Sequence, residues 1–144
     1  MKTLLMLILM MFPQHHKEHQ IVLLYDENLY NNSLTLSNVY RELLLEEINS
    51  PEIVIKQIIW ETGWLKCKYC SLNSNNLIGF SYDGVHYLKF KTWKQCIKYL
   101  KEYQLKYLYE NEEYYSFLIR IHWATDRNYI NSLKQIKYEK MFNR

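Results

Sequence analysis

The sequence contains little glycine and proline, with three glycines and two prolines in a chain of 144 residues. Sheets built from short strands and tight turns need these residues at many positions, so their scarcity argues against a turn-rich all-β fold. Aromatic residues are abundant instead, with 14 tyrosines, five phenylalanines and four tryptophans. Because 49% of its residues are hydrophobic, a chain of this length can bury one substantial core. We therefore expect one mainly helical domain whose aromatic side chains lie in the core or on a binding surface.

Dense clusters of lysine and arginine are also absent. The formal net charge is +3 and charged residues make up 23% of the chain, which is mildly basic. Nucleic-acid surfaces show stronger clustering of positive charge than this. We therefore predict no nucleic-acid partner.

Cysteine is scarce, and the number of cysteines is odd. Because only Cys67, Cys70 and Cys96 occur, a disulfide scaffold is not expected. The first two form one C-x-x-C pair, whereas a structural zinc site usually has a second pair. His86 and His122 are the alternative ligands that would complete such a site. We expect Cys67 and Cys70 to be thiols on one helical turn, and we predict neither a metal nor an organic cofactor.

The apolar run near the amino terminus extends from Leu4 to Phe12, which is shorter than the roughly 20 residues that span a bilayer, so we predict no stable membrane span. One lysine precedes the run and a polar segment follows it, as in a secretory signal, although no A-x-A-like cleavage site is present. We expect residues 1–19 to be a signal-like leader and residues 20–144 a single domain of a secreted, periplasmic or cell-wall-associated protein. The alternative is a packed or amphipathic helix in a protein released by another route, such as phage delivery.

Two helices are predicted before residue 64. Apolar residues recur at steps of three and four between residues 34 and 48, which is the pattern of an amphipathic helix. The next helix is expected to have Ser50 as its N-cap, Pro51 at its first position and Gly63 at its end. The segment WLKCKYCSL that follows is expected to form a short third helix.

The second half of the chain contains a hairpin signal followed by three helices. Two β-rich runs flank Asp83-Gly84 in LIGFSYDGVHYLKF, which predicts a tight hairpin turn. Thr92 and Gln95 form a capping-box pattern at the start of a long helix. Further helices are expected near residues 112–121 and 128–142. The predicted fold class is α+β, mainly α, with one small β-hairpin lobe.

One acidic residue, Glu61, lies among apolar residues in the stretch IIWETGW. On a helix it shares a face with Gln57 and Ile58. Its apolar neighbours and the negative end of the helix dipole both disfavour a charged carboxylate, so Glu61 is a candidate general acid that keeps its proton near neutral pH. Cleavage of a sugar acetal is the reaction that most needs such an acid. The alternative is a solvent-facing glutamate at a frayed helix end.

Four segments resemble, in order, those of the bacterial cell-wall glucosaminidases of glycoside hydrolase family 73. PEIVIKQIIWETGW and NNLIGF are similar to the family's helix ending in A-Q-x-x-x-E-[ST]-G-W and its N-N-L-F-G segment. YLKFKTWKQCIKYLKEY and YYSFLIRIHWATDRNYINSLKQI are similar to two later family segments. The resemblance covers roughly residues 36 to 136. It implies a lysozyme-like fold that hydrolyses peptidoglycan glycan strands after N-acetylglucosamine, as autolysins do.

The resemblance also assigns roles to individual residues. Glu61 matches the essential acid of the family, and Leu77 and Gly79 belong to the segment that lies in the glycan cleft. Exposed rings would suit the apolar faces of sugars. The residues that the resemblance predicts to bind substrate are Asn76, Phe80, Tyr115, Trp123 and Tyr129.

The sequence departs from the family pattern at single positions. Lys56 replaces a small residue, Trp123 stands where the family usually has tyrosine, and Arg127 stands where it has proline. Tryptophan keeps a flat face for a sugar but lacks the phenol hydroxyl. Any hydrogen bond made by that hydroxyl in the family is therefore lost here.

The predicted hairpin is shorter than the β lobe that supplies a second carboxylate in some members. Asp83 is the only acidic residue between residues 62 and 101. We take Asp83 as a candidate second catalytic residue, with a purely structural role in the D-G turn as the alternative. Loss of the second acid would leave a glycan-binding protein without catalysis, which is the competing function.

Overall fold

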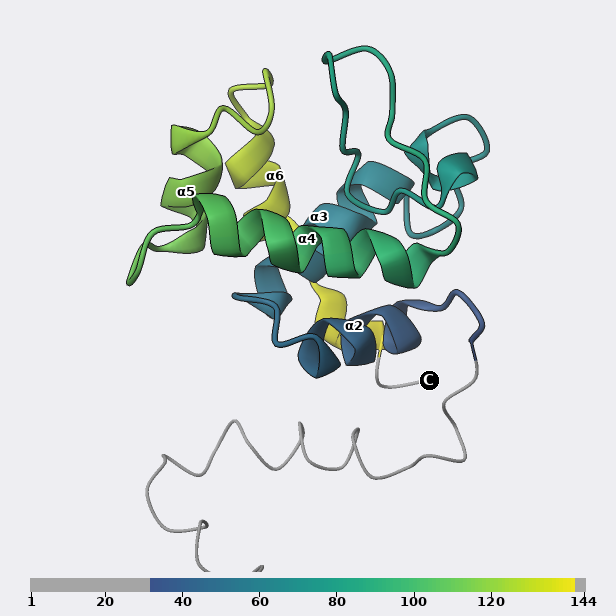
Figure 1. Cartoon of the computed structure of the whole chain (residues 1–144). Coiled ribbons are helices and arrows are strands. Elements are labelled where there is room, and N and C mark those ends of the chain that lie inside the picture. Colours follow the sequence, from purple (N-terminus) through teal and green to yellow (C-terminus); the bar gives the residue numbers. More distant parts are fainter. Residues whose placement is uncertain (1–31, 142–144) are drawn as a thin grey trace, which may run out of the picture. The chain divides into compact units, whose positions relative to one another are not determined.

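The computed structural model describes residues 32–141, which are mainly helical (Figure 1). Their helices, in chain order, are α2 (Leu36–Leu45), α3 (Pro51–Thr62), η2 (Ser71–Ser74), α4 (Trp93–Tyr107), α5 (Tyr114–Arg120), α6 (Tyr129–Gln135) and η3 (Tyr138–Met141), where η marks a 3₁₀ helix. The prediction of a mainly α fold is confirmed. The predicted leader at residues 1–19 lies outside the described residues. Within the described part, no helix combines the length and the apolar character needed to cross a membrane.

Helix α3 occupies a central place in the packing, because it contacts α2, α6 and η2. Its side chains Ile55 and Ile58 are fully buried, and Ile59 is nearly so. Helix α4, which packs on α2, buries Ile97 and Leu100, three residues apart on one face. Each fully buried aliphatic side chain contributes roughly 1.5–3 kcal/mol to stability. Because α3 is held from several sides, the residues at its C-terminal end are firmly positioned.

The boundaries of α3 and α4 follow the predicted capping residues. The Thr92 hydroxyl accepts a hydrogen bond from the Gln95 backbone amide at 3.3 Å, which confirms the predicted N-cap of α4. Pro51 and Gly63 lie at the first position and the C-cap of α3, as predicted. Ser50 has a left-handed backbone, with φ of 52°, and its side chain makes no capping bond. Ser50 is therefore the N-cap residue of α3, as predicted, but it does not cap the helix through its side chain.

The predicted helix in WLKCKYCSL does not form. Trp64 and Leu65 have φ values of 62° and 59°, so the chain leaves helical geometry directly after α3. Only the later part of the segment enters the 3₁₀ helix η2. Cys67 and Cys70 form a disulfide, and their Cα atoms are 6.0 Å apart, a usual separation for a disulfide. The prediction of two free thiols on one helical turn is therefore wrong.

The predicted β-hairpin lobe is also wrong, since the described residues contain no strand. Ser81 and Tyr87 form a single isolated antiparallel bridge. Between them, Asp83 Oδ1 accepts hydrogen bonds from the backbone amides of Val85 at 2.9 Å and His86 at 2.7 Å. These local bonds compete with ladder formation. All residues from 81 to 87 are exposed, so no buried face fixes a strand register.

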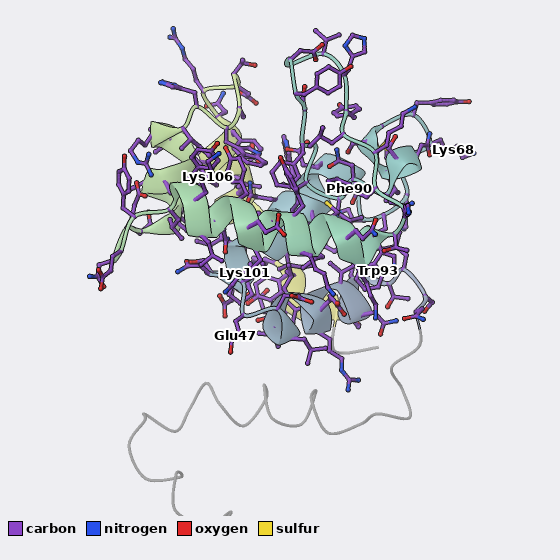
Figure 2. All side chains as sticks on the ribbon, in the orientation of Figure 1. Glu47, Lys68, Phe90, Trp93, Lys101 and Lys106 are labelled. Atoms are coloured by element: carbon purple, nitrogen blue, oxygen red, sulfur yellow. A yellow bond between two sulfur atoms is a disulfide. The ribbon has the colours of Figure 1, made fainter. Side chains whose placement is uncertain are left out.

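Gln104 ties α4 to the loop that precedes α3. Its side chain is buried and exchanges two hydrogen bonds with the backbone of Asn49, at 2.8 and 3.1 Å. Lys101, one helical turn earlier, donates to the carbonyl oxygen of Glu47 at 2.6 Å (Figure 2). The start of α3 is thus fixed to α4 by polar contacts as well as by apolar packing.

We predict that Gln104→Ala lowers the free energy of unfolding by about 2 kcal/mol, because it removes two buried hydrogen bonds and leaves the Asn49 backbone groups unpaired. Urea denaturation followed by circular dichroism measures this value. The control is Glu102→Ala, an exposed position on the same helix, which should change the value by less than about 0.5 kcal/mol. Equal effects of the two substitutions would contradict the prediction.

Candidate active site

Glu61 occupies the last turn of α3, and the residues after it end the helix sharply. Thr62 is fully buried; its hydroxyl donates to the Ile58 carbonyl at 2.6 Å and accepts from the Leu65 amide at 3.1 Å. Gly63 then adopts a left-handed backbone with φ of 53°. These interactions fix the end of the helix and therefore the backbone of Glu61.

The carboxyl group of Glu61 packs against the backbone of Gly79. A β-carbon built on Gly79 would lie 3.1 Å from Oε2 of Glu61, so a larger residue would require the carboxyl group to move. Gly79 also has a φ of 77°, which glycine adopts without strain. Glycine at this position therefore allows the segment after η2 to cover one side of the carboxyl group.

Asn76 holds the Gly79 segment in place. Its Oδ1 accepts a hydrogen bond from the Phe80 amide at 3.0 Å, and its Nδ2 donates to the carbonyls of Phe80 at 2.8 Å and Leu88 at 3.0 Å. Asn76 is fully buried. Asn76 is predicted to bind substrate, and in the structure its side-chain amide is hydrogen-bonded within the protein. These bonds set the shape of the loop that meets Glu61.

Tyr129, from α6, meets Glu61 on another side. The Tyr129 hydroxyl donates to Glu61 Oε1 at 3.2 Å and accepts from Gln57 Nε2 at 3.3 Å. The ring of Trp60 lies edge-on to the Tyr129 ring, with 6.5 Å between centroids. Because Tyr129 is only 4% exposed, its main contact is with the glutamate and the core. The structure therefore brings together two predicted site residues, Glu61 and Tyr129.

Burial and hydrogen bonding act in opposite directions on the Glu61 carboxyl group. Desolvation by burial raises its pKa, while the hydrogen bond from Tyr129 lowers it, and the net effect is a raised pKa. The pKa of Tyr129 is also raised, first by burial and then by the negative charge of Glu61. Tyr129 is therefore a neutral hydrogen-bond donor, and Glu61 keeps its proton to a higher pH than an ordinary glutamate.

Asp83 lies in the exposed turn between residues 81 and 87. Its Oδ2 is 2.6 Å from His86 Nδ1, and its Oδ1 accepts the two backbone amides described above. The hydrogen bonds from His86 and from the backbone lower the pKa of Asp83 to about 2. The hydrogen bonds of Asp83 all stay within its own turn in the described part of the chain. In this structure Asp83 stabilises the turn and does not contact Glu61.

Phe80 is the centre of an aromatic cluster. Its ring centroid lies 4.9 Å from that of Tyr99 and 5.4 Å from those of Tyr103 and Trp123. Phe80 is 6% exposed, so it anchors the Gly79 segment to α4 and offers little surface to a ligand. Trp123 is partly exposed at the edge of the cluster. Of these two predicted substrate-binding residues, Trp123 is the one that solvent reaches.

The remaining aromatic candidates are distributed over different elements. Tyr115, on α5, is partly buried, and Lys134 Nζ lies 5.0 Å from its ring centroid. Trp60 and Trp64 are close to half exposed and flank Glu61 in the sequence. Trp60 was expected only as an apolar neighbour of Glu61. Its exposure could have been predicted from Lys56, which lies four residues earlier on the same face of α3.

No group of three or more His, Cys, Asp or Glu side chains within residues 32–141 could hold a metal ion. Cys67 and Cys70 are joined to each other, so they do not offer thiolate ligands in this state. Glu61 and Tyr129 are titratable groups that the fold brings together at the end of α3.

We predict that Glu61→Gln stabilises the protein at neutral pH. The pKa of Glu61 is higher in the folded than in the unfolded state, so its favourable contribution is present below the unfolded pKa and is lost as pH rises through the folded pKa. The free energy of unfolding of the variant should therefore exceed that of the wild type increasingly from about pH 4 to pH 7. Urea titrations over this range measure the difference, and a difference independent of pH would contradict the prediction.

Comparison with known families places these residues in context. Residues 37–141 match the glucosaminidase family model, described as mannosyl-glycoprotein endo-beta-N-acetylglucosaminidase. The matched range is more than half of the chain and includes Glu61, the Asn76–Phe80 segment and Tyr129. No curated protein and no solved structure matches the chain significantly. The chain belongs to the glucosaminidase family.

Proposed function

We propose that the protein is an endo-β-N-acetylglucosaminidase that cleaves the glycan strands of peptidoglycan after N-acetylglucosamine. The observation that carries this proposal is the Glu61 carboxyl group, which is desolvated, has a raised pKa and is bonded to a neutral tyrosine. Membership of the glucosaminidase family supports the substrate class. The proposal includes a lysozyme-like arrangement of the helices and an extracytoplasmic location, by secretion to the cell wall or by phage delivery.

In the proposed reaction Glu61 is the general acid. Its proton passes to the glycosidic oxygen as the bond from that oxygen to the anomeric carbon breaks. The negative charge that remains on Glu61 is stabilised by the Tyr129 hydroxyl, which already donates to Oε1. A raised pKa favours this step because the carboxyl group must be protonated when the substrate arrives.

The second half of the reaction requires a group that attacks the anomeric carbon. Asp83 is ionised, but it is engaged by His86 and two backbone amides in an exposed turn. We therefore assign the attack to the carbonyl oxygen of the substrate's own N-acetyl group, which forms a cyclic intermediate as the leaving hydroxyl departs. Water then opens this ring at the anomeric carbon and returns a proton to Glu61, so that the acid is regenerated.

Exposed rings near Glu61 would bind the sugars. Trp60 and Trp64 lie on either side of the acid in the sequence and expose 47% and 44% of their surface. Trp123 supplies a partly exposed ring at the edge of the aromatic cluster. Such rings stack on the apolar faces of sugars, so these three tryptophans are proposed glycan contacts.

A glycan-binding protein without catalysis is the second candidate function. It is favoured by one observation, that Asp83 is held in its own turn and no second carboxylate is bonded to the Glu61 site within the described residues. Binding of wild-type protein to purified cell walls without release of reducing ends would support it.

We predict that wild-type protein releases reducing ends from purified cell walls and that Glu61→Gln lowers this rate by about 10²–10⁴-fold, the usual contribution of a general acid. Glutamine keeps the shape of the side chain and can still accept the Tyr129 hydrogen bond, but it cannot donate the acidic proton. Glu102→Gln, at an exposed position on α4, is the control and should retain the wild-type rate. Retained activity in Glu61→Gln would remove Glu61 from the mechanism.

We predict that Gly79→Ala lowers the rate at least about tenfold relative to Gly84→Ala, equivalent to about 1.4 kcal/mol in the activation barrier. Both glycines have positive φ values, 77° and 79°, so alanine strains both positions. Only at Gly79 would the new β-carbon meet Glu61, because nothing lies within 4 Å of the corresponding atom at Gly84. Rates are compared after urea denaturation has shown that both variants are folded.

If the two glycine variants lose activity equally, backbone strain alone explains the loss. The contact between residue 79 and the carboxyl group would then have no part in the reaction.

A further inference from the structure

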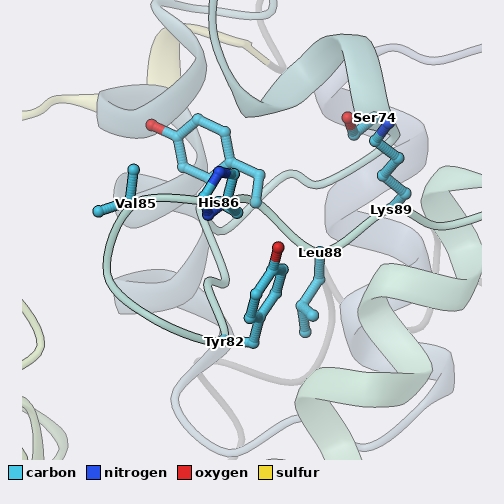
Figure 3. A pocket seen from close by; sticks show the side chains of 7 residues that line it. Ser74, Tyr82, Val85, His86, Leu88 and Lys89 are labelled. Atoms are coloured by element: carbon cyan, nitrogen blue, oxygen red, sulfur yellow. The ribbon is translucent and has the colours of Figure 1, made fainter.

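A pocket of about 530 Å³ lies beside the turn at residues 81–87 (Figure 3). Tyr82, Tyr87, Val85 and Leu88 give it apolar walls. In the view of Figure 3, Ser74 and Lys89 lie on the opposite side from Val85. The residues that line it are Ser74, Tyr82, Val85, His86, Tyr87, Leu88 and Lys89. None of these residues was assigned a role above in the reaction at Glu61.

The walls of this pocket are held by contacts among its own residues. The His86 ring stacks on the Tyr82 ring, with 5.6 Å between centroids and 11° between planes. Asp83 fixes the other edge of His86 through the 2.6 Å contact to Nδ1. On the opposite side, the Ser74 carbonyl accepts a hydrogen bond from the amide of Phe90, next to Lys89, at 2.9 Å. These contacts orient the Tyr82 and His86 rings and hold the backbone beside Lys89.

The pocket begins where the segment that covers Glu61 ends. The Leu88 amide donates to the Phe80 carbonyl at 2.9 Å, and Asn76 Nδ2 donates to the Leu88 carbonyl at 3.0 Å. Phe80 directly follows Gly79, whose backbone packs on the Glu61 carboxyl group. Leu88, which lines the pocket, is therefore bonded through its backbone to the residue that follows Gly79.

The part of the chain around the pocket has a marked excess of positive charge. Residues 62–101 contain seven lysines and one acidic residue, Asp83, which is already engaged by His86. Lys94, Lys98 and Lys101 interact with residues 42–47 of α2 and its C-terminal end. The other four are exposed and have no ion-pair partner within the described residues: Lys66, Lys68, Lys89 and Lys91. One of these, Lys89, lines the pocket.

We propose that this pocket binds the peptide stem of the peptidoglycan substrate, with Lys89 contacting a stem carboxylate, a proposal that rests on the function proposed above. The stem is attached to the sugar next to N-acetylglucosamine, so it leaves the glycan within one sugar of the bond that Glu61 would cleave. It combines small apolar side chains, which suit the walls, with carboxylates, which suit Lys89. Neutral sugar rings offer no charge to this lysine. A long polyanion would need a row of cations inside the pocket, which has one lysine.

Equilibrium binding to two matched probes tests the proposal. The first probe is a soluble peptidoglycan tetrasaccharide that carries its peptide stems. The second is the same tetrasaccharide after an amidase has removed the stems and the lactyl carboxylates left by that hydrolysis have been converted to neutral amides. Binding is measured with full-length protein in the Glu61→Gln background, so that neither probe is consumed. We expect Lys89→Gln to weaken binding of the stem-bearing probe about three- to tenfold and to leave binding of the bare probe unchanged, with a larger loss for Lys89→Glu.

Lys137→Gln is the matched control, because it removes the same charge from an exposed position between α6 and η3. It should bind both probes as the parent does. The proposal is overturned if Lys89→Gln binds the stem-bearing probe as tightly as the control, if it weakens both probes equally, or if the parent does not prefer the stem-bearing probe.

Turnover of the stem-bearing probe by wild-type protein is followed separately. Preferential binding of the stem-bearing probe without turnover would contradict the proposed hydrolase and still support the pocket. Turnover of the stem-bearing probe together with equal binding of both probes would support the proposed hydrolase and contradict the proposed pocket.

Discussion

The packing of the Glu61 carboxyl group against the backbone of Gly79 is the contact on which the rest of the candidate site depends. A carboxyl group at a helix end is normally solvated, and a solvated glutamate has no reason to keep its proton at neutral pH. Here a glycine lets backbone replace water on one side of the group. The backbone at Gly79 is held in place on its C-terminal side. Asn76 hydrogen-bonds both the amide and the carbonyl of Phe80, and the Phe80 ring is packed in the aromatic cluster. Several buried residues therefore determine the surroundings of the Glu61 carboxyl group.

The hydrogen bond from Tyr129 sets a limit on how strongly Glu61 holds its proton. Burial alone would penalise the carboxylate further, and a charged partner such as arginine would lower the pKa far enough to remove the acid. A neutral hydroxyl lies between these extremes, since it stabilises the carboxylate by one hydrogen bond without adding a positive charge. The same hydroxyl accepts from Gln57, which orients its proton toward Glu61. In the proposed reaction Glu61 loses and regains a proton in each cycle, and this intermediate strength suits both steps.

The sequence predicted the elements whose signals are local and missed those decided by competing interactions. Helices α2, α3 and α4 were found from periodic apolar residues and from Pro51, Gly63 and Thr92, because these features act within a few residues of the helix they define. Glu61 was found because it occupies a helix end within a recognisable motif. The turn at residues 81–87 was misjudged because Asp83 binds the amides that a ladder would have used. The contact between Glu61 and Tyr129 joins residues 68 positions apart, and no periodicity or spacing records it.

The residues around Glu61 and the turn at residues 81–87 are stabilised in different ways. The proposed proton transfer and the proposed binding of the peptide stem therefore depend on different sets of contacts. Glu61, Tyr129 and Asn76 are held by the helical core, so a change in any neighbour would alter the geometry of proton transfer. The 81–87 turn is held mainly by its own side chains, through Asp83, His86 and Tyr82, and it is exposed throughout. Exposed loops tolerate substitution far better than core positions do. If the proposed stem-binding pocket is built on this turn, its preference for the peptide can change without disturbing Glu61, the proposed general acid.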